Sequence, residues 1–141
     1  MKTFGTAEWN GGFKDGKGAI STKSGALKAY PYGVGARFEG KPGTNPEELI
    51  GAAHAGCFTM AFALFLSGQG ITAEHIDTQS DVELEKEGEG FAVKKVHLTV
   101  KAKIPGTDES KFQEVAKQAK ENCPISKLLT ATITMDATLV S

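Results

Sequence analysis

The chain has 141 residues, a length that fits a single domain, residues 1–141, with a hydrophobic core of its own. Its 16 Lys and Arg residues are dispersed and balanced by 17 Asp and Glu, so no basic surface is expected to attract nucleic acid. Two cysteines are too few for a disulfide-stabilised secreted domain, and they match no zinc spacing. The N-terminus lacks the apolar segment of a signal peptide, so we expect a cytoplasmic protein, in which a disulfide would be catalytic rather than structural.

The first part of the chain is rich in glycine and lacks helical periodicity, which predicts strands near 3–12, 17–23 and 33–39. Residues 14–18 contain Asp-Gly, a pair that tolerates positive φ, and predict a hairpin turn. We expect Tyr30-Pro31-Tyr32-Gly33 to interrupt the strand pattern.

A long apolar helix is predicted to begin at Asn45-Pro46, a helix-capping residue followed by a proline suited to the first helical position. Glu48 falls at the capping-box position. A helix from Pro46 to Gly68 would run about 34 Å at about 1.5 Å per residue. The segment 49–66 reaches the length of a short membrane span, but its Ala and Gly content and missing basic flank favour burial in protein. A second subunit would complete that burial, so we expect an intimate homodimer.

The second half alternates strands and helices. The sequence predicts a strand at 81–85, a turn at 87–90, a strand with a bulge near Lys94-Lys95, an amphipathic helix at 108–121, a short helix from Cys123-Pro124 and a last strand around 133–139. Strands thus precede, separate and follow the helices, which is the order of an α+β fold rather than of repeated βαβ units.

Cys57 lies inside the apolar helix, with Phe58, Phe62 and Phe65 near enough to hold an apolar substrate beside the sulfur. The simpler interpretation is a small buried hydrophobic residue. Apolar burial alone raises the pKa of a thiol and makes it inert, so a reactive Cys57 needs a cation nearby.

Arg37, the only arginine, is the candidate cation, because its planar fork of donors can hold a thiolate and a carboxylate together. Glu47 is the candidate carboxylate, although an acid in a first helical turn also complements the helix dipole. Glu47 and Cys57 are ten residues apart, about 15 Å along one helix. Antiparallel helices across a dimer axis could bring Glu47 of one chain to Cys57 of the other, which predicts active sites at the subunit interface.

His54 precedes Cys57 by three residues, so a Cys–His pair for acyl transfer is an alternative. A packed core histidine is the favoured interpretation, since the sequence offers no third residue to orient the ring. The histidines and cysteines have no metal-ligand spacing, and the glycine-rich segments form no phosphate loop.

Cys123 is predicted to cap a short helix, where free N–H groups and the helix dipole favour a thiolate, although the capping thiol could be accidental. Together the cysteines indicate peroxidatic chemistry. A Cys57 thiolate would attack the terminal oxygen of ROOH, release ROH and leave a sulfenic acid, which Cys123 would convert to a disulfide.

The sequence resembles the OsmC/Ohr family of osmotically inducible and organic-hydroperoxide-resistance proteins, and most closely its OsmC branch. Four segments carry the resemblance, which covers the whole chain: Arg37-Phe38-Glu39-Gly40, Thr44-Asn45-Pro46-Glu47-Glu48-Leu49, Ala52-Ala53-His54-Ala55-Gly56-Cys57-Phe58 and Asn122-Cys123-Pro124-Ile125-Ser126.

This resemblance implies a thiol peroxidase in which Cys57 is peroxidatic, Cys123 is resolving, Arg37 activates Cys57 and Glu47 holds Arg37. It also implies an intertwined homodimer with long central helices enclosed by curved, mostly antiparallel sheets. Organic hydroperoxides would be preferred to hydrogen peroxide, and electrons would come from an external dithiol such as a dihydrolipoyl protein. No metal or prosthetic group and no membrane or nucleic-acid partner is expected.

The leading hypothesis is therefore a cytoplasmic hydroperoxide reductase active in oxidative or osmotic stress defence. Two alternatives remain at this level: a thiol enzyme of acyl-transfer type that uses His54 and Cys57, and a non-catalytic dimeric module that binds a small apolar ligand.

Overall fold

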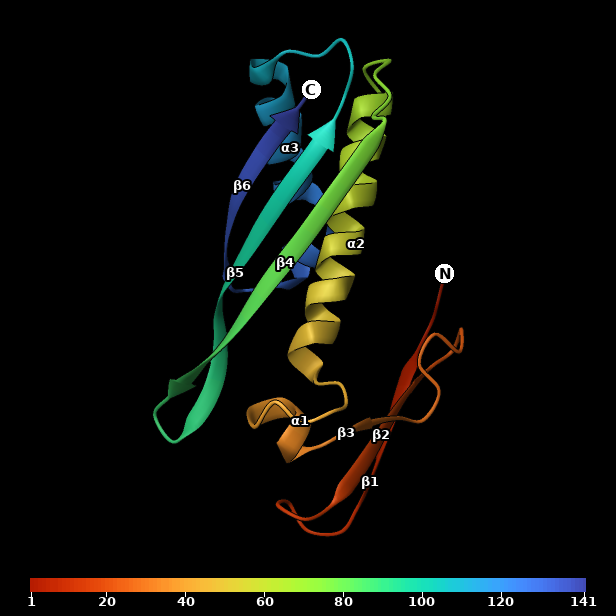
Figure 1. The fold of residues 1–141 in the computed structure, drawn as a ribbon, viewed down its shortest axis with the longest axis vertical. Helices are drawn as coiled ribbons and strands as arrows, with labels where there is room; N and C mark the ends of the chain where they lie inside the picture. Colours follow the sequence, from red (N-terminus) through yellow and green to blue (C-terminus); the bar gives the residue numbers. More distant parts are fainter. The chain divides into compact units, whose positions relative to one another are not determined.

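The computed structural model describes residues 1–141 (Figure 1), which form two compact units, Met1–Leu49 and Ile50–Ser141. Each unit contains one three-stranded sheet. The prediction that the chain is one domain stays a prediction.

The sheet of the first unit has the order β1-β2-β3 and is antiparallel throughout. Its strands are β1 (Gly5–Asn10), β2 (Lys17–Thr22) and β3 (Tyr30–Tyr32). The predicted hairpin between β1 and β2 is confirmed, since Asn10 pairs with Lys17. Its positive φ, 99°, falls on Gly11 rather than on the Asp-Gly pair.

The strand predicted at 33–39 is wrong, because Val34–Phe38 form a short helix, α1. The predicted interruption at Tyr30–Gly33 is wrong as well, since Tyr30–Tyr32 form β3. Pro31 fits there because β3 is an edge strand, which tolerates a residue without an N–H group. After Gly33 the chain closes a helical turn, in which Arg37 N donates to Gly33 O at 3.0 Å.

The long helix α2 (Pro46–Ser67) begins as predicted, because Asn45 Oδ1 accepts a hydrogen bond from Glu48 N at 2.8 Å. The reciprocal half of the expected capping box is not formed. Glu48 instead accepts a hydrogen bond from the Thr44 hydroxyl at 2.7 Å. The helix is unbroken over 22 residues.

The sheet of the second unit has the order β4-β5-β6. Its strands are β4 (His75–Glu87), β5 (Gly90–Lys103) and β6 (Thr132–Val140). A two-residue turn, Gly88-Glu89, joins β4 to β5 in antiparallel pairing, as predicted. The chain then passes through α3 (Glu109–Asn122) and α4 (Pro124–Leu128) before β6 pairs with β5 in parallel. The α+β class is confirmed.

The predicted bulge in β5 is confirmed at Lys94. Glu83 pairs with Lys95 and Leu84 pairs with Val93, so the backbone of Lys94 has no pairing partner in β4. The extra residue explains why the apolar positions of β5 shift by one residue after Val93. A bulge inserts one residue into the two-residue alternation of side chains between the faces of a strand.

A single stripe of α2 forms the core of the second unit, together with α3 and the inner face of the sheet. The buried residues of this cluster are Phe58, Phe62, Leu66, Leu98, Val100, Ala102, Ile104, Phe112, Val115, Ala116 and Ala119. Helix α2 is long and apolar enough to cross a membrane by length and composition alone, and here its stripe packs in a protein core. Another face stays apolar and exposed, with Met60 at 76% and Leu64 at 66%.

Candidate active site

The two cysteines meet in the second unit as free thiols. Cys123 is fully buried at the N-terminus of α4, where its sulfur accepts a hydrogen bond from Ser126 N at 3.3 Å and Pro124 occupies the first turn. Cys57 is half-buried on α2, and the Cys123 thiol lies close enough to influence its pKa. The fold therefore brings together two residues that are 66 positions apart in the chain.

The environment of Cys57 in the single chain favours the protonated thiol. Burial is the largest cause that raises the pKa of Cys57, and the neighbouring Cys123 raises it further. A backbone hydrogen bond from Ile125, at the start of α4, acts in the opposite direction. No cation contributes, so the thiolate needs a positive charge that these surroundings do not supply.

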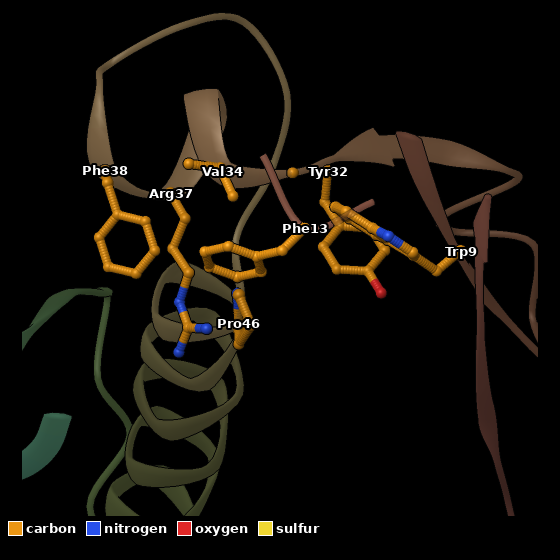
Figure 2. Close-up of a pocket in the computed structure, with 8 residues that line it drawn as sticks. Trp9, Phe13, Tyr32, Val34, Arg37, Phe38 and Pro46 are labelled. Carbon is orange, nitrogen blue, oxygen red and sulfur yellow. The ribbon is translucent and has the colours of Figure 1, made fainter. Parts of the chain in front are cut away.

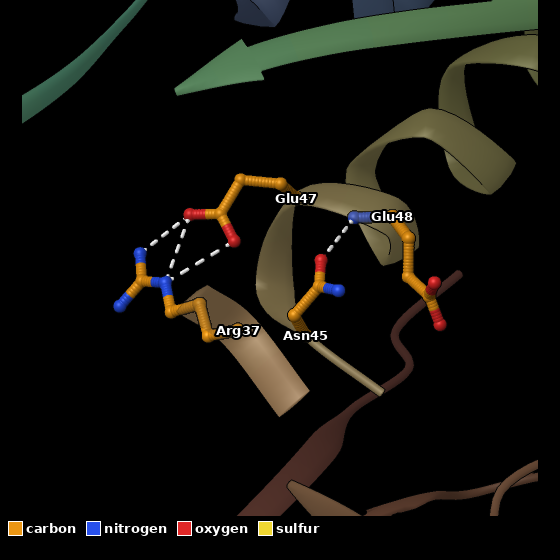
Figure 3. A network of polar contacts seen from close by, with 4 residues as sticks. All are labelled: Arg37, Asn45, Glu47 and Glu48. Carbon is orange, nitrogen blue, oxygen red and sulfur yellow. Dashed lines mark hydrogen bonds and ion pairs between the residues drawn. The ribbon is translucent and has the colours of Figure 1, made fainter. Parts of the chain in front are cut away.

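Arg37 and Glu47 form an ion pair within the first unit (Figure 3). Arg37 Nε lies 3.1 and 3.2 Å from the two carboxylate oxygens of Glu47, and Nη2 lies 2.5 Å from Oε1. The guanidinium carbon is also 5.4 Å from the centre of the Phe38 ring. α1 supplies the arginine and the first turn of α2 supplies the carboxylate, so the fork is fixed in direction while part of it stays accessible.

An apolar pocket of about 380 Å³ lies beside this ion pair (Figure 2). The residues that line it are Trp9, Phe13, Tyr32, Gly33, Val34, Arg37, Phe38 and Pro46. Arg37 is the only charged residue among them, so the pocket combines an apolar wall with one fixed cation. Trp9 and Phe13 were not predicted from the sequence. The available signal was a phenylalanine at the tip of a glycine-rich hairpin, where an apolar side chain has no local packing partner.

Packing of Trp9 on Tyr32 shapes one wall of the pocket. The ring centres are 5.6 Å apart in an edge arrangement. Gly18, between them on β2, leaves the space for this contact, since a Cβ atom there would lie 2.7 Å from Trp9 Cε3.

His54 is fully buried and lies on the core stripe of α2. Its Nδ1 is 3.2 Å from Ser80 Oγ, and its Nε2 is 2.8 Å from Ser126 Oγ. Burial lowers the pKa of His54. Both ring nitrogens are engaged by serines, so the Cys57–His54 pair required for the acyl-transfer alternative is not formed.

The remaining histidines lie on the exposed face of the second sheet, where His75 contacts Asp77 and His97 contacts Asp136. No group of three or more His, Cys, Asp or Glu side chains is arranged to hold a metal ion.

Two thiols that lie side by side on an α+β scaffold form the arrangement that thiol–disulfide chemistry requires. Residues 38–138 match the family model of the OsmC-like proteins. The chain belongs to the OsmC-like protein family.

Among its relatives, the chain is similar to the peroxiredoxin OsmC of Escherichia coli (strain K12), with 51% identity over 137 residues that cover 97% of this chain and 96% of that protein. It is also similar to the organic hydroperoxide resistance protein OhrB of Bacillus subtilis (strain 168), with 30% identity over 119 residues, 78% of this chain and 79% of that protein. The crystal structure of that OhrB matches with a TM-score of 0.68 and 27% identity, covering 97% of this chain and 98% of the other.

A second crystal structure, of an organic hydroperoxide resistance protein OsmC from Legionella pneumophila, matches with a TM-score of 0.70 and 26% identity. It covers all of this chain, 100%, and 98% of its own. These findings confirm the predicted family, and the protein is an enzyme, a cysteine-based peroxidase.

Proposed function

We propose that the protein reduces organic hydroperoxides to alcohols, and hydrogen peroxide more weakly, through a disulfide between Cys57 and Cys123. The observation that carries the proposal is the contact between the two free thiols. The Cys57 thiolate attacks the terminal oxygen of ROOH, the O–O bond breaks, and the alkoxide leaves as ROH with a proton. The sulfenic acid on Cys57 then reacts with Cys123 to give the disulfide and water.

Activation of Cys57 requires a cation, and Arg37 has the chemistry for that role. Glu47 holds the guanidinium by two nitrogens and leaves donors for a thiolate and a peroxide oxygen. Cys57 lies ten residues beyond Glu47 on an unbroken helix, about 15 Å along its axis. The arginine that serves Cys57 therefore comes from the second subunit of a homodimer, and each active site is shared between two chains.

The exposed face of α2 supports this homodimer. It carries the small residues Ala52, Ala53 and Gly56, followed by Met60 and Leu64. Small side chains let two helices approach closely, and large apolar ones need cover from water. A second copy of α2, packed antiparallel on the first, provides that cover and carries its own Arg37–Glu47 pair toward Cys57.

The pocket beside Arg37 supports a preference for organic hydroperoxides. Its walls are aromatic and aliphatic, which suits an alkyl or aryl group, whereas hydrogen peroxide gains nothing from them. Relatives of the chain carry the name organic hydroperoxide resistance protein.

We further propose that the enzyme acts in the cytoplasm in defence against oxidative or osmotic stress. It requires no bound cofactor or metal, because the two thiols carry the electrons. An external dithiol such as a dihydrolipoyl protein restores them by thiol–disulfide exchange. Neither a membrane nor a nucleic acid is part of this function.

The test is the intact mass and free-thiol count before and after one equivalent of cumene hydroperoxide. The expected result is a loss of two hydrogens per subunit, with Cys57 and Cys123 linked in the peptide map. An unchanged mass for folded protein would contradict the proposal and favour a ligand-binding role.

Replacement of Arg37 by lysine tests the role of the guanidinium. We expect oxidation of Cys57 to slow by about tenfold to a hundredfold, because an ammonium group cannot hold a carboxylate and a thiolate in one plane. The measurement is the rate of thiol loss with excess cumene hydroperoxide, with Lys41→Arg as a control that alters a nearby exposed cation. Equal rates for wild type and Arg37→Lys would remove Arg37 from the mechanism.

Truncation of Phe13 to alanine tests the pocket. We expect kcat/KM for cumene hydroperoxide to fall about tenfold, since removal of an aromatic wall costs on the order of 1–2 kcal/mol of apolar contact. The value for hydrogen peroxide should change little. Comparison of the two substrates in one preparation provides the control, and a parallel loss for both would show that Phe13 supports the fold rather than the substrate.

A further inference from the structure

A network of polar side chains, buried except for the half-buried Ser80, leads from the Cys123 thiol into the protein. The Cys123 thiol donates to Ser126 Oγ, with the two atoms 3.2 Å apart. Ser126 Oγ lies 2.8 Å from His54 Nε2, and His54 Nδ1 lies 3.2 Å from Ser80 Oγ. The proposed disulfide chemistry makes no use of His54 or Ser126.

One placement of the protons satisfies every hydrogen bond in this network. With the thiol proton on Cys123 directed at Ser126, the Ser126 hydroxyl proton is free to point at His54 Nε2. His54 then keeps its own proton on Nδ1 and donates it to Ser80. Each donor serves the next group, so a proton that leaves Cys123 has a continuous path to the imidazole.

His54 is in the neutral form, which has a lone pair that can accept that proton. His54 is fully buried, and burial lowers its pKa, so the ring is neutral with a free lone pair on Nε2. No Asp, Glu, Lys or Arg side chain contributes to the pKa of His54 or of Cys57, and Cys123 is the titratable neighbour that raises the pKa of Cys57. Cys123 supplies the cap of α4 by accepting from Ser126 N, so the Ser126 hydroxyl is left to bond with His54.

We propose that His54, acting through the Ser126 hydroxyl, is a positioning residue that takes up the proton of Cys123 when the disulfide closes. The inference rests on the proposed function. Cys123 Sγ attacks the sulfur of the Cys57 sulfenic acid, the S–S bond forms and the S–O bond breaks. The thiol proton passes to Ser126 as the Ser126 proton passes to His54. The imidazolium then returns a proton through the Ser126 hydroxyl to the departing hydroxide, which leaves as water.

The redox balance of this step is internal to the two sulfurs, because Cys123 is oxidised while the sulfenic sulfur of Cys57 is reduced. When an external dithiol later reduces the disulfide, the same hydrogen-bond network delivers a proton to the departing Cys123 thiolate. His54 thus serves the resolving thiol rather than the peroxidatic one.

The experiment measures disulfide closing as a step separate from Cys57 oxidation. One equivalent of cumene hydroperoxide is mixed with wild type, His54→Gln, Ser126→Ala and the double variant. Each reaction is quenched with acid and its products are measured by intact mass spectrometry. His97→Gln is the matched control, because it makes the same change at an exposed histidine. The expected result is closing at least about tenfold slower in each single variant, with the appearance of sulfenic acid unchanged.

Two further readouts separate a proton path from a structural role. The double variant is expected to close no more slowly than the slower single variant, since both substitutions break one path. The slowing of closing in D₂O, present in wild type, is expected to diminish in both single variants. Closing at the wild-type rate, losses that multiply in the double variant, or an unchanged isotope effect would each overturn the proposal.

Diamide, a thiol oxidant that adds to one cysteine and is displaced by the second, keeps this test independent of peroxide chemistry. If cumene hydroperoxide oxidises no variant, the proposed function fails, while closing after diamide addition still reports on His54. Equal diamide closing rates in wild type and His54→Gln would then overturn the relay, and a slower rate in the variant would support it.

Discussion

Replacing Cys57 by serine is expected to reduce hydroperoxide turnover to that of buffer, a loss of at least about a thousandfold. A serine hydroxyl stays protonated at neutral pH and is a weak nucleophile, whereas a thiolate attacks peroxide oxygen readily. The sulfur of Cys57 is also the atom that borders Cys123, so the substitution removes the first step and the partner for the second. Consumption of cumene hydroperoxide with an excess dithiol measures the effect.

The control for this variant is a measurement of its stability, which shows that it is folded. Oxygen in place of sulfur is a small change at a half-buried site, so urea unfolding should shift by no more than about 1–2 kcal/mol. Turnover at the wild-type rate in folded Cys57→Ser protein would rule out Cys57 as the nucleophile.

Replacing Cys123 by serine is expected to stop steady turnover and preserve a single oxidation per subunit. Cys57 still reacts with the hydroperoxide, but its sulfenic acid finds no thiol beside it. A serine hydroxyl at the cap of α4 can still accept the hydrogen bond from Ser126 N, so the short helix should persist. Reaction with dimedone, which labels sulfenic acids, followed by mass measurement gives the yield per subunit.

The two cysteine variants are informative as a pair. Dimedone labelling should appear in Cys123→Ser and be absent from Cys57→Ser. If Cys123→Ser sustains many turnovers with a dithiol at the wild-type rate, the reductant attacks Cys57 directly and Cys123 is not the resolving thiol.

Local sequence rules were sufficient for the elements whose ends are set by their own side chains. Asn45 and Pro46 start α2, and Asp108 caps α3 by accepting from Lys111 N at 2.7 Å. Such signals act over three or four residues, so the sequence expresses them directly. The bulge at Lys94 was also predictable, because one extra residue in a strand shifts the alternation of its side chains by one position.

The region from Tyr30 to Phe38 was mispredicted because long-range pairing decides it. β3 is a strand only because Pro31 and its neighbours pair with β2, and Thr44 N donates to Pro31 O at 2.9 Å. The lack of helical periodicity indicated a strand at 33–39, yet the five residues that follow Gly33 close a single helical turn instead. Propensities this weak are readily overridden by tertiary contacts.

The candidate site was predictable as a set of residue types and not as a geometry. Arg37, Glu47, Cys57 and Cys123 were named from their chemistry, and the sequence could only suggest which of them meet. The hydrogen-bond partners of His54 are serines on β4 and α4, 26 and 72 residues away, so no local sequence pattern predicts them. The pocket depends on Phe13 in a hairpin loop, and loop geometry follows from packing that spacing does not encode.

Lys94, the residue of β5 without a backbone partner, could be lost without changing which side chains of the strand face the core. Leu84 already faces Val93, and Val82 faces Val96, so a chain that lacked Lys94 would keep the same side chains inward. Such a deletion would change the curvature instead, because a bulge bends its strand and increases the twist. The bulge at Lys94 therefore sets the direction of the β4–β5 hairpin tip without changing which side chains enter the core.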